Sequence, residues 1–166
     1  MKTKQIVLAA AFALATLSGF AAGNDVKVIA HRGYWTAPGS AQNSIDALAK
    51  AAEAGCYGSE FDIWMTSDSV LVVNHDGWIN GHNVQVTPSE IICAQKIENG
   101  ETVPALEQYF QEALKYPDLR LICEMKFPDS KWQEVKLAQK MCELAKKYGV
   151  EDRIDYITFS RDGMYS

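Results

Sequence analysis

Short apolar runs alternate with amphipathic segments along most of the chain. Runs rich in branched and aromatic residues predict five strands, at residues 26–30, 58–65, 70–74, 119–126 and 154–159. Apolar positions at helical spacing predict three helices, at residues 41–54, 104–114 and 130–148, the last ending at Gly149. This alternation predicts an α/β fold with a mostly parallel sheet, either an open doubly wound sheet or a TIM-type barrel.

Residues 76–100 interrupt the alternation after the third strand. The pairs Asn80-Gly81 and Asn99-Gly100 favour tight reversals, so this segment is predicted to be a small insertion with hairpin character. Only residues 66–69 separate the second and third strands, a linker too short to join parallel neighbours. The two strands therefore form a hairpin, or an extended segment makes the return.

The first residues have the layout of a secretory signal peptide. Lys2 and Lys4 precede an uncharged stretch with an apolar centre at residues 6–17, followed by small residues. The apolar centre is shorter than the roughly 20 residues that a membrane-spanning helix, the alternative, requires. We expect residues 1–22 to be a signal peptide, residues 23–166 to form one domain, and the protein to be secreted or periplasmic.

Composition narrows the function classes. The chain has 166 residues, 48% of them apolar, and a net charge of -5, which excludes a disordered chain and makes nucleic acid an unexpected partner. The four cysteines contain no C-x-x-C pair, which argues against a structural zinc site. We expect buried thiols, although an oxidising compartment would permit disulfides.

Polar residues gather where predicted strands end. His31 and Arg32 follow the first strand, His75 follows the third, and Glu124 and Lys126 close the fourth. Because the carboxyl ends of strands form the active-site rim of alternating α/β folds, residues far apart in sequence can converge there.

Three carboxylates are predicted to point to one interior. Glu60 and Asp62 share one face of their strand, and Glu124 shares a face with Lys126. Burying carboxylates costs several kcal/mol each unless a cation compensates them. An all-oxygen ligand set suits Mg²⁺ or Ca²⁺; the alternative is that Glu60 and Asp62 only pair with Arg32 and Lys126.

Two histidines suit acid/base chemistry near neutral pH. His31 and His75 lie at matching strand ends, so one can remove a proton from a nucleophile while the other protonates the leaving oxygen. His82 lies beside Asn80-Gly81 and is interpreted as an exposed loop residue.

Six short motifs in order resemble the glycerophosphodiester phosphodiesterase family, of the phospholipase C-like phosphodiesterase superfamily. They are His31-Arg32-Gly33, Asn43-Ser44, Glu60-x-Asp62, Thr66-x-Asp68, His75-Asp76 and Glu124-x-Lys126. The resemblance implies a TIM-type barrel and a divalent metal. It also implies hydrolysis of glycerophosphodiesters, such as deacylated phospholipid head groups, to an alcohol and glycerol 3-phosphate.

The resemblance also implies roles for residues. His31 and His75 would be the acid/base pair, and Arg32 and Lys126 would bind the substrate phosphate. The metal ligands would be Glu60, Asp62 and Glu124. Tyr34 and Trp35 are candidates for the alcohol pocket, although aromatic residues at such positions more often pack in the core.

Two of the sequence's departures from the family bear on the site and on the fold. Ala41-Gln42-Asn43 stands where the family usually has Pro-Glu-Asn, so a neutral amide replaces an acid near the site. Five predicted strands fall short of the eight that a TIM barrel needs, so the barrel is expected to be incomplete. The alternatives are an inactive remnant that at most binds ligands, and another metal-dependent hydrolase on a similar barrel. The sequence leaves the oligomeric state open.

Overall fold

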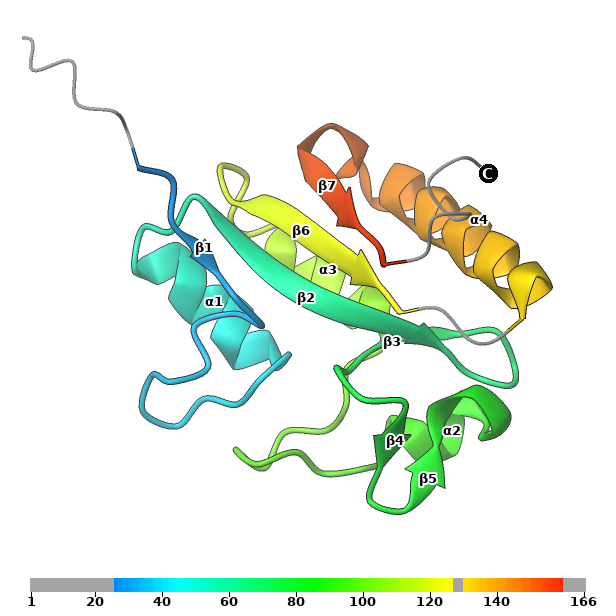
Figure 1. The fold of residues 1–166 in the computed structure, drawn as a ribbon. Coiled ribbons are helices and arrows are strands. Elements are labelled where there is room, and N and C mark those ends of the chain that lie inside the picture. Colours follow the sequence, from blue (N-terminus) through cyan, green and yellow to red (C-terminus); the bar gives the residue numbers. More distant parts are fainter. Residues whose placement is uncertain (1–25, 127–129, 160–166) are drawn as a thin grey trace, which may run out of the picture.

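A computed structural model describes residues 26–126 and 130–159 (Figure 1). The predicted signal peptide lies outside the described residues. In chain order, the elements are β1 (Ile29–Ala30), α1 (Ile45–Glu53), β2 (Gly58–Met65), β3 (Leu71–Val73), β4 (Trp78–Ile79), β5 (His82–Asn83), the 3-10 turn η1 (Val84–Val86), α2 (Ser89–Ile92), α3 (Leu106–Ala113), β6 (Arg120–Met125), α4 (Lys131–Tyr148), the 3-10 turn η2 (Glu151–Arg153) and β7 (Ile154–Ile157).

The main sheet is mostly parallel. Strands β1, β2, β6 and β7 lie side by side in that order and are parallel, while β3 pairs antiparallel with β2. The second and third predicted strands therefore form a hairpin, and Ser69 in its turn adopts a left-handed conformation with φ 66°. Along the β2–β6 ladder, Asp62 is the partner of Glu124. Four of the five strands thus have the parallel arrangement of a barrel wall.

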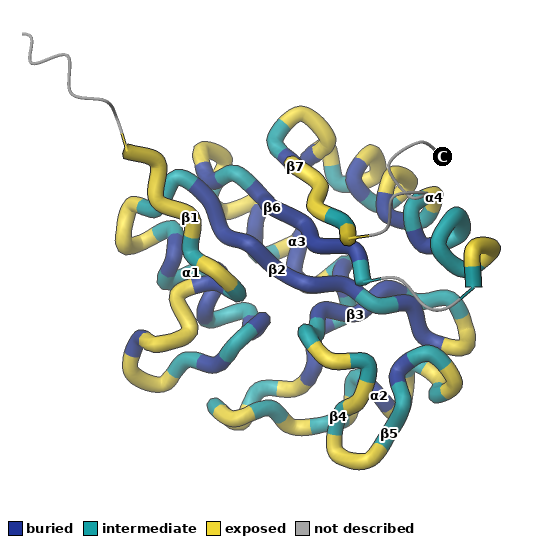
Figure 2. The backbone as a smooth tube through the Cα atoms, in the orientation of Figure 1, coloured by how far each residue is buried: buried dark blue, intermediate teal, exposed yellow. Residues whose placement is uncertain are grey.

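Helices α1, α3 and α4 cover one face of this sheet (Figure 1). Phe61, Ile63 and Cys123 point toward these helices and belong to the main core with Tyr109 and Phe110. Figure 2 shows that β2 and β6 are buried along most of their length. Because apolar side chains occupy the helix-facing side, the alternate positions carry Glu60, Asp62 and Glu124 on the other side, as predicted.

Two helix ends show how local sequence sets the boundaries. Helix α1 begins at Ile45 rather than at residue 41 because the Ser44 hydroxyl caps it, accepting a hydrogen bond from the Ala47 amide at 2.9 Å. Just before the cap, Asn43 has φ 59°, which is incompatible with a helix. Helix α4 ends at Gly149 as predicted, with φ 63°.

The insertion after β3 contains a short hairpin, as expected. Strands β4 and β5 pair antiparallel around Asn80 (φ 47°) and Gly81 (φ 84°), the conformation that an Asn-Gly turn favours. A second, smaller core of Val72, Val84, Ile92 and Val103 attaches the insertion to β3. The prediction that His82 is an exposed loop residue is wrong, because it pairs with Ile79 in the hairpin and is half-buried.

The cysteines are free, in line with the expectation of thiols. Cys123 is buried, Cys56 and Cys93 are half-buried, and Cys142 is exposed. The prediction of buried thiols is therefore confirmed fully for Cys123 and is wrong for Cys142. Within residues 26–126 and 130–159, no helix has the length and hydropathy needed to cross a bilayer.

Candidate active site

Three carboxylates meet on the helix-free face of the sheet. Glu60 and Asp62 come from β2 and Glu124 from β6, and one oxygen of each lies within 4.8 Å of the others. The three residues are only 4%, 0% and 8% exposed, respectively. The parallel register explains this convergence, because it places Asp62 directly beside Glu124.

Two cations flank the acidic cluster. The Lys126 ammonium lies 3.0 Å from Asp62 Oδ1 and also contacts Glu124 Oε1. The Arg32 Nε lies 3.8 Å from Asp62 Oδ2. These contacts match the alternative in which ion pairing alone compensates the carboxylates. However, the side chains of Arg32 and Lys126 contact Asp62 and Glu124 rather than Glu60.

The carboxylate of Glu60 is only partly compensated by hydrogen bonds and ion pairs. Its Oε2 accepts a hydrogen bond from the Arg32 backbone amide at 2.8 Å, but its Oε1 is buried without a hydrogen-bond partner. Burial, reinforced by the charges of Asp62 and Glu124, raises the pKa of Glu60 from 4.5 to about 7. A buried, uncompensated carboxylate in an all-oxygen set fits a divalent cation of the Mg²⁺ or Ca²⁺ type.

The turn after β1 brings Arg32 and His31 to Glu60. Arg32 has φ 57° and Gly33 φ 75°, and the Gly33 amide donates to the backbone oxygen of Glu60 at 3.1 Å. A Cβ on Gly33 would lie 2.6 Å from the Cβ of Ala47, so only glycine fits between this turn and α1. His31 is largely exposed, and its Nε2 lies 3.8 Å from Glu60 Oε2.

Sequence reasoning gave no role to Asn43, although the structure places it in the site. Its side-chain amide donates to Asp62 Oδ2 at 2.8 Å, and its carbonyl accepts from the Asp62 backbone amide at 3.1 Å. The neighbouring Gln42 accepts a hydrogen bond from the Arg32 guanidinium. The available signal was the position of Asn43 directly before the cap residue Ser44, where a left-handed asparagine is favoured.

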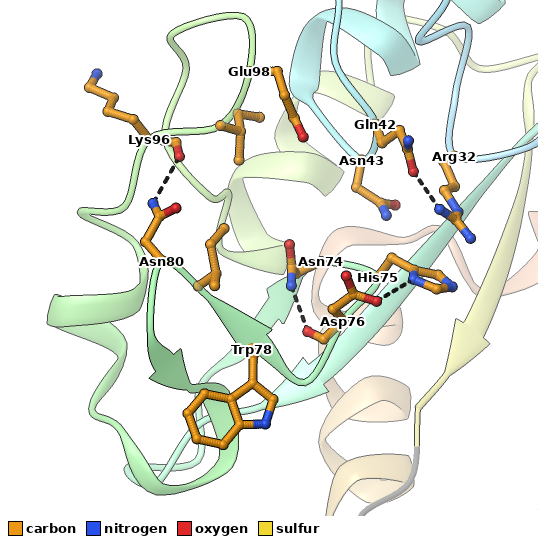
Figure 3. Close-up of a pocket in the computed structure, with 12 residues that line it drawn as sticks. Arg32, Gln42, Asn43, Asn74, His75, Asp76, Trp78, Asn80, Lys96 and Glu98 are labelled. Atoms are coloured by element: carbon orange, nitrogen blue, oxygen red, sulfur yellow. Dashed lines mark hydrogen bonds and ion pairs between the residues drawn. The ribbon is translucent and has the colours of Figure 1, made fainter.

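His75 follows β3, where the chain enters the insertion. Its Nδ1 lies 2.8 Å from Asp76 Oδ1, and the Trp64 indole donates to its backbone oxygen at 3.1 Å. His75 and Arg32 line one cavity of about 550 Å³, shown in Figure 3. His31 does not line this cavity; it lies instead with Tyr34 and Trp35 on a second cavity of about 410 Å³.

The parallel strands carry an acidic cluster, with Arg32, Lys126 and histidines near it. This arrangement is typical of a TIM-type barrel protein whose site lies at the strand ends. The chain belongs to the glycerophosphoryl diester phosphodiesterase family, whose family model matches residues 31–162. This finding confirms the resemblance read from the six motifs, and the family is one of phosphodiester hydrolases.

Solved structures and a sequence relative agree with this family assignment. A glycerophosphodiester phosphodiesterase from Parabacteroides distasonis is 44% identical with a TM-score of 0.81, over 82% of this chain and 58% of that one. An uncharacterized protein, YqiK, from Bacillus subtilis (strain 168) is 30% identical over 151 residues, covering 83% of this chain and 60% of that protein.

A phosphodiesterase from Oleispira antarctica, solved with the product sn-glycerol-3-phosphate, matches with a TM-score of 0.73 at 20% identity, which bears on the fold alone. It covers 84% of this chain and 60% of that one. The chain therefore spans about 60% of the length of these relatives, and the described sheet corresponds to part of their TIM-type barrel.

Proposed function

We propose that the protein hydrolyses glycerophosphodiesters to an alcohol and glycerol 3-phosphate. The observation that carries this proposal is the buried cluster of Glu60, Asp62 and Glu124, bordered by Lys126 and by Arg32, which also lines the cavity beside His75. Family membership supports the same reaction class.

Glu60, Asp62 and Glu124 would hold a divalent cation, Mg²⁺ or Ca²⁺. The unpartnered Oε1 of Glu60 and the negative charge of the cluster support this assignment. Such an ion, when bound, supplies Lewis-acid polarisation of a phosphoryl oxygen. Asn43 holds Asp62 in its orientation through two hydrogen bonds, so the ligand set is organised before an ion binds.

Arg32 and Lys126 would bind the phosphate oxygens of the substrate. Hydrogen bonds and the charges of Asp62 and Glu124 raise the pKa of Lys126 despite its partial burial, so its ammonium stays charged at neutral pH. A fixed guanidinium and ammonium stabilise the negative charge that grows on the phosphoryl group in the transition state.

His31 and His75 would act as general acid and base. The carboxylate of Asp76 holds Nδ1 of His75 at 2.8 Å, which orients the ring and leaves Nε2 to transfer a proton. His31 lies on an exposed turn, with its Nε2 3.8 Å from Glu60 Oε2. The nucleophile is water or a hydroxyl group of the substrate glycerol, and the two rings provide the proton acceptor and the donor.

The test is hydrolysis of glycerophosphocholine and glycerophosphoethanolamine by the purified protein with Mg²⁺, Ca²⁺ or a chelator, with circular dichroism on the same samples. We expect metal-dependent release of glycerol phosphate. His31→Ala and His75→Ala should each lower kcat at least about 100-fold with an unchanged fold. His82→Ala is the matched control, since His82 lies outside both cavities.

Three results would contradict the proposal in different ways. Full activity of either site variant would refute the acid/base assignment, and full activity with chelator would refute the metal. A folded protein that binds a glycerophosphodiester without turnover would instead identify a binding remnant, the second candidate. That candidate is favoured by the placement of His31 and His75, which line different cavities.

We further propose that the protein is secreted or periplasmic, on the basis of the signal-peptide layout of residues 1–22. Expression in a bacterial host followed by fractionation and mass measurement tests this proposal. An N-terminus shortened by about 22 residues in the periplasmic fraction is the expected result. Full-length protein confined to the cytoplasmic fraction would contradict it.

A further inference from the structure

The cavity beside His75 has two chemically different walls. Arg32 and Gln42 form the wall next to the acidic cluster, and Asn80 and Glu98 contribute the opposite wall from the insertion (Figure 3). Its volume of about 550 Å³ lies in the range of small-molecule sites. A ligand whose phosphate lies near Arg32 would therefore extend the rest of the molecule toward the insertion.

The lining of the cavity offers hydrogen-bond acceptors. The Asn80 side-chain nitrogen donates to the oxygens of Gln95 and Lys96, at 3.3 and 3.2 Å. The Asn74 side-chain nitrogen donates to the Asp76 backbone oxygen at 2.6 Å. Because both amide nitrogens are engaged with protein oxygens, the side-chain carbonyl oxygens of Asn74 and Asn80 remain available as acceptors.

The charge of the wall from the insertion is negative. Within the described part of the chain, the exposed Glu98 carboxylate has no hydrogen bond or ion pair, and Figure 3 shows it directed toward the cavity. The Lys96 ammonium does not neutralise it, because it donates to the Gly100 backbone oxygen at 2.9 Å and points away from the cavity. A cationic group of the ligand would thus meet an unpaired carboxylate.

The cavity has few groups that could bind a cation that lacks N–H groups. Quaternary ammonium groups are held by the faces of aromatic rings. Among the cavity's lining residues, Trp78 is the one tryptophan, tyrosine or phenylalanine, and Figure 3 shows its ring directed away from the cavity, 61% exposed. A primary ammonium, in contrast, has three N–H donors for the acceptors of Asn74, Asn80 and Glu98.

We infer that this cavity selects leaving alcohols that carry a primary ammonium group, with Glu98 as the specificity-determining residue. The inference rests on the proposed phosphodiesterase function and names the substrate class of the same site. Glycerophosphoethanolamine is then favoured over its N-methylated relatives, because each added methyl group removes one N–H donor.

The experiment compares glycerophosphoethanolamine, its N,N-dimethyl derivative and glycerophosphocholine. Binding is measured by calorimetry and turnover by release of glycerol phosphate, with the wild-type protein and with Glu98→Gln. Glu90→Gln is the matched control, since it removes the same charge from an exposed position on α2 outside the cavity.

We expect affinity and kcat/KM to fall along the methylation series. Glu98→Gln should weaken the ethanolamine compound about tenfold and the choline compound less than about twofold. Glu90→Gln should leave the order and the values unchanged. If Glu98→Gln weakened all three compounds equally, Glu98 would contact their shared glycerol phosphate and the inference would be wrong.

Calorimetry separates failure of the inference from failure of the proposed reaction. Preferential binding of the ethanolamine compound without turnover would uphold the selectivity and refute catalysis by this chain. Turnover of all three compounds at equal kcat/KM would uphold the reaction and overturn the selectivity. Absence of binding to any of them would overturn the inference.

Discussion

At the scale of single residues, amide donors as well as cations hold the acidic cluster together. Asn43 exchanges two hydrogen bonds with Asp62, and the Arg32 backbone amide donates to Glu60. Both Asn43 and Arg32 have left-handed backbone conformations, with φ 59° and 57°. Such a conformation costs about 1 to 2 kcal/mol in most residues and less in asparagine, so the fold tolerates strain at Arg32 to place its amide donor.

The role of Asn43 can be separated into its side chain and its backbone. Asn43→Ala removes two buried hydrogen bonds and keeps the strained φ, so we expect the free energy of unfolding to fall by about 3 kcal/mol. Asn43→Gly removes the same bonds without the strain and should be about 1 kcal/mol more stable than the alanine variant. Urea denaturation measures both, and equal stability of the two variants would contradict the argument.

Glu60 makes the metal-free protein sensitive to pH. Its pKa is about 7 in the folded state against an ordinary 4.5, so the folded state binds the proton more tightly. The resulting stabilisation is complete below pH 4.5 and is lost as the pH rises through 7.

We therefore expect the Tm of chelator-treated protein to fall from pH 5 to 8 more steeply in the wild type than in Glu60→Gln. Thermal scans in matched buffers check this expectation. Added Mg²⁺ or Ca²⁺ should reverse the loss at pH 8 in the wild type, because metal binding requires the deprotonated carboxylate. Identical pH profiles for the wild type and the variant would show that Glu60 does not carry the proton.

The sequence was sufficient to group the charged site residues but not to orient them. Alternation along β2 predicted that Glu60 and Asp62 share a face, and the structure confirms this. The roles of Asn43 and Gln42 depend on the left-handed turn after residue 41, which brings two segments distant in sequence into contact. Periodicity alone contains no information about such contacts.

At the scale of elements, the contact between the turn after β1 and helix α1 sets the position of Arg32. Gly33 lies so close to Ala47 that an added Cβ would be 2.6 Å from the Ala47 Cβ. The Tyr34 amide also donates to the Ala47 backbone oxygen at 2.9 Å. The turn is therefore packed against and hydrogen-bonded to the helix, and α1 indirectly positions the guanidinium.

Two glycines with nearly the same φ test this contact. Gly33 (φ +75°) meets Ala47, whereas nothing lies within 4 Å of a Cβ placed on Gly55 (φ +73°). We expect Gly55→Ala to cost about 1 kcal/mol of stability and Gly33→Ala about 3 kcal/mol, because only the latter adds a steric overlap. Chemical denaturation measures both, and equal costs would show that α1 can shift away.

Element types were predictable, whereas several ends were not. The strands and helices of the sheet appear where apolar periodicity placed them, since their faces are buried against one another. Strand β1 is only Ile29–Ala30, shorter than the predicted residues 26–30, because its pairing with β2 covers only Gly58 and Ser59. Which partner a strand end finds is a tertiary property that local sequence does not specify.

At the scale of the whole molecule, burial is concentrated in the middle of the sheet. Strands β2 and β6 are buried along most of their length, while β1 and β7 have exposed residues (Figure 2). The insertion is held by its own small core and by Asp68, which accepts hydrogen bonds from the Ser89 amide and hydroxyl at 3.0 and 2.7 Å.

This distribution predicts the order of amide hydrogen exchange. Amides of β2 and β6 should exchange slowest, by global unfolding, and those of β4 and β5 at least about 100-fold faster, by local opening of the insertion. Exchange measured by mass spectrometry after proteolysis checks this order. Equal protection of β4 and β2 would mean that the insertion and the sheet unfold as one cooperative unit.

The position of the site along the chain has a consequence for biosynthesis. Every residue assigned to metal, phosphate or proton transfer lies between His31 and Lys126, so α4 and β7 contribute no such group. At roughly 5 to 20 residues per second, a ribosome adds this segment in about 5 to 19 s. The acidic cluster can therefore assemble once β6 has left the exit tunnel and pairs with β2, before α4 has left the tunnel. If the proposed divalent ion is not yet bound at that stage, Lys126 and Arg32 are the cations within the described residues that offset the three carboxylates.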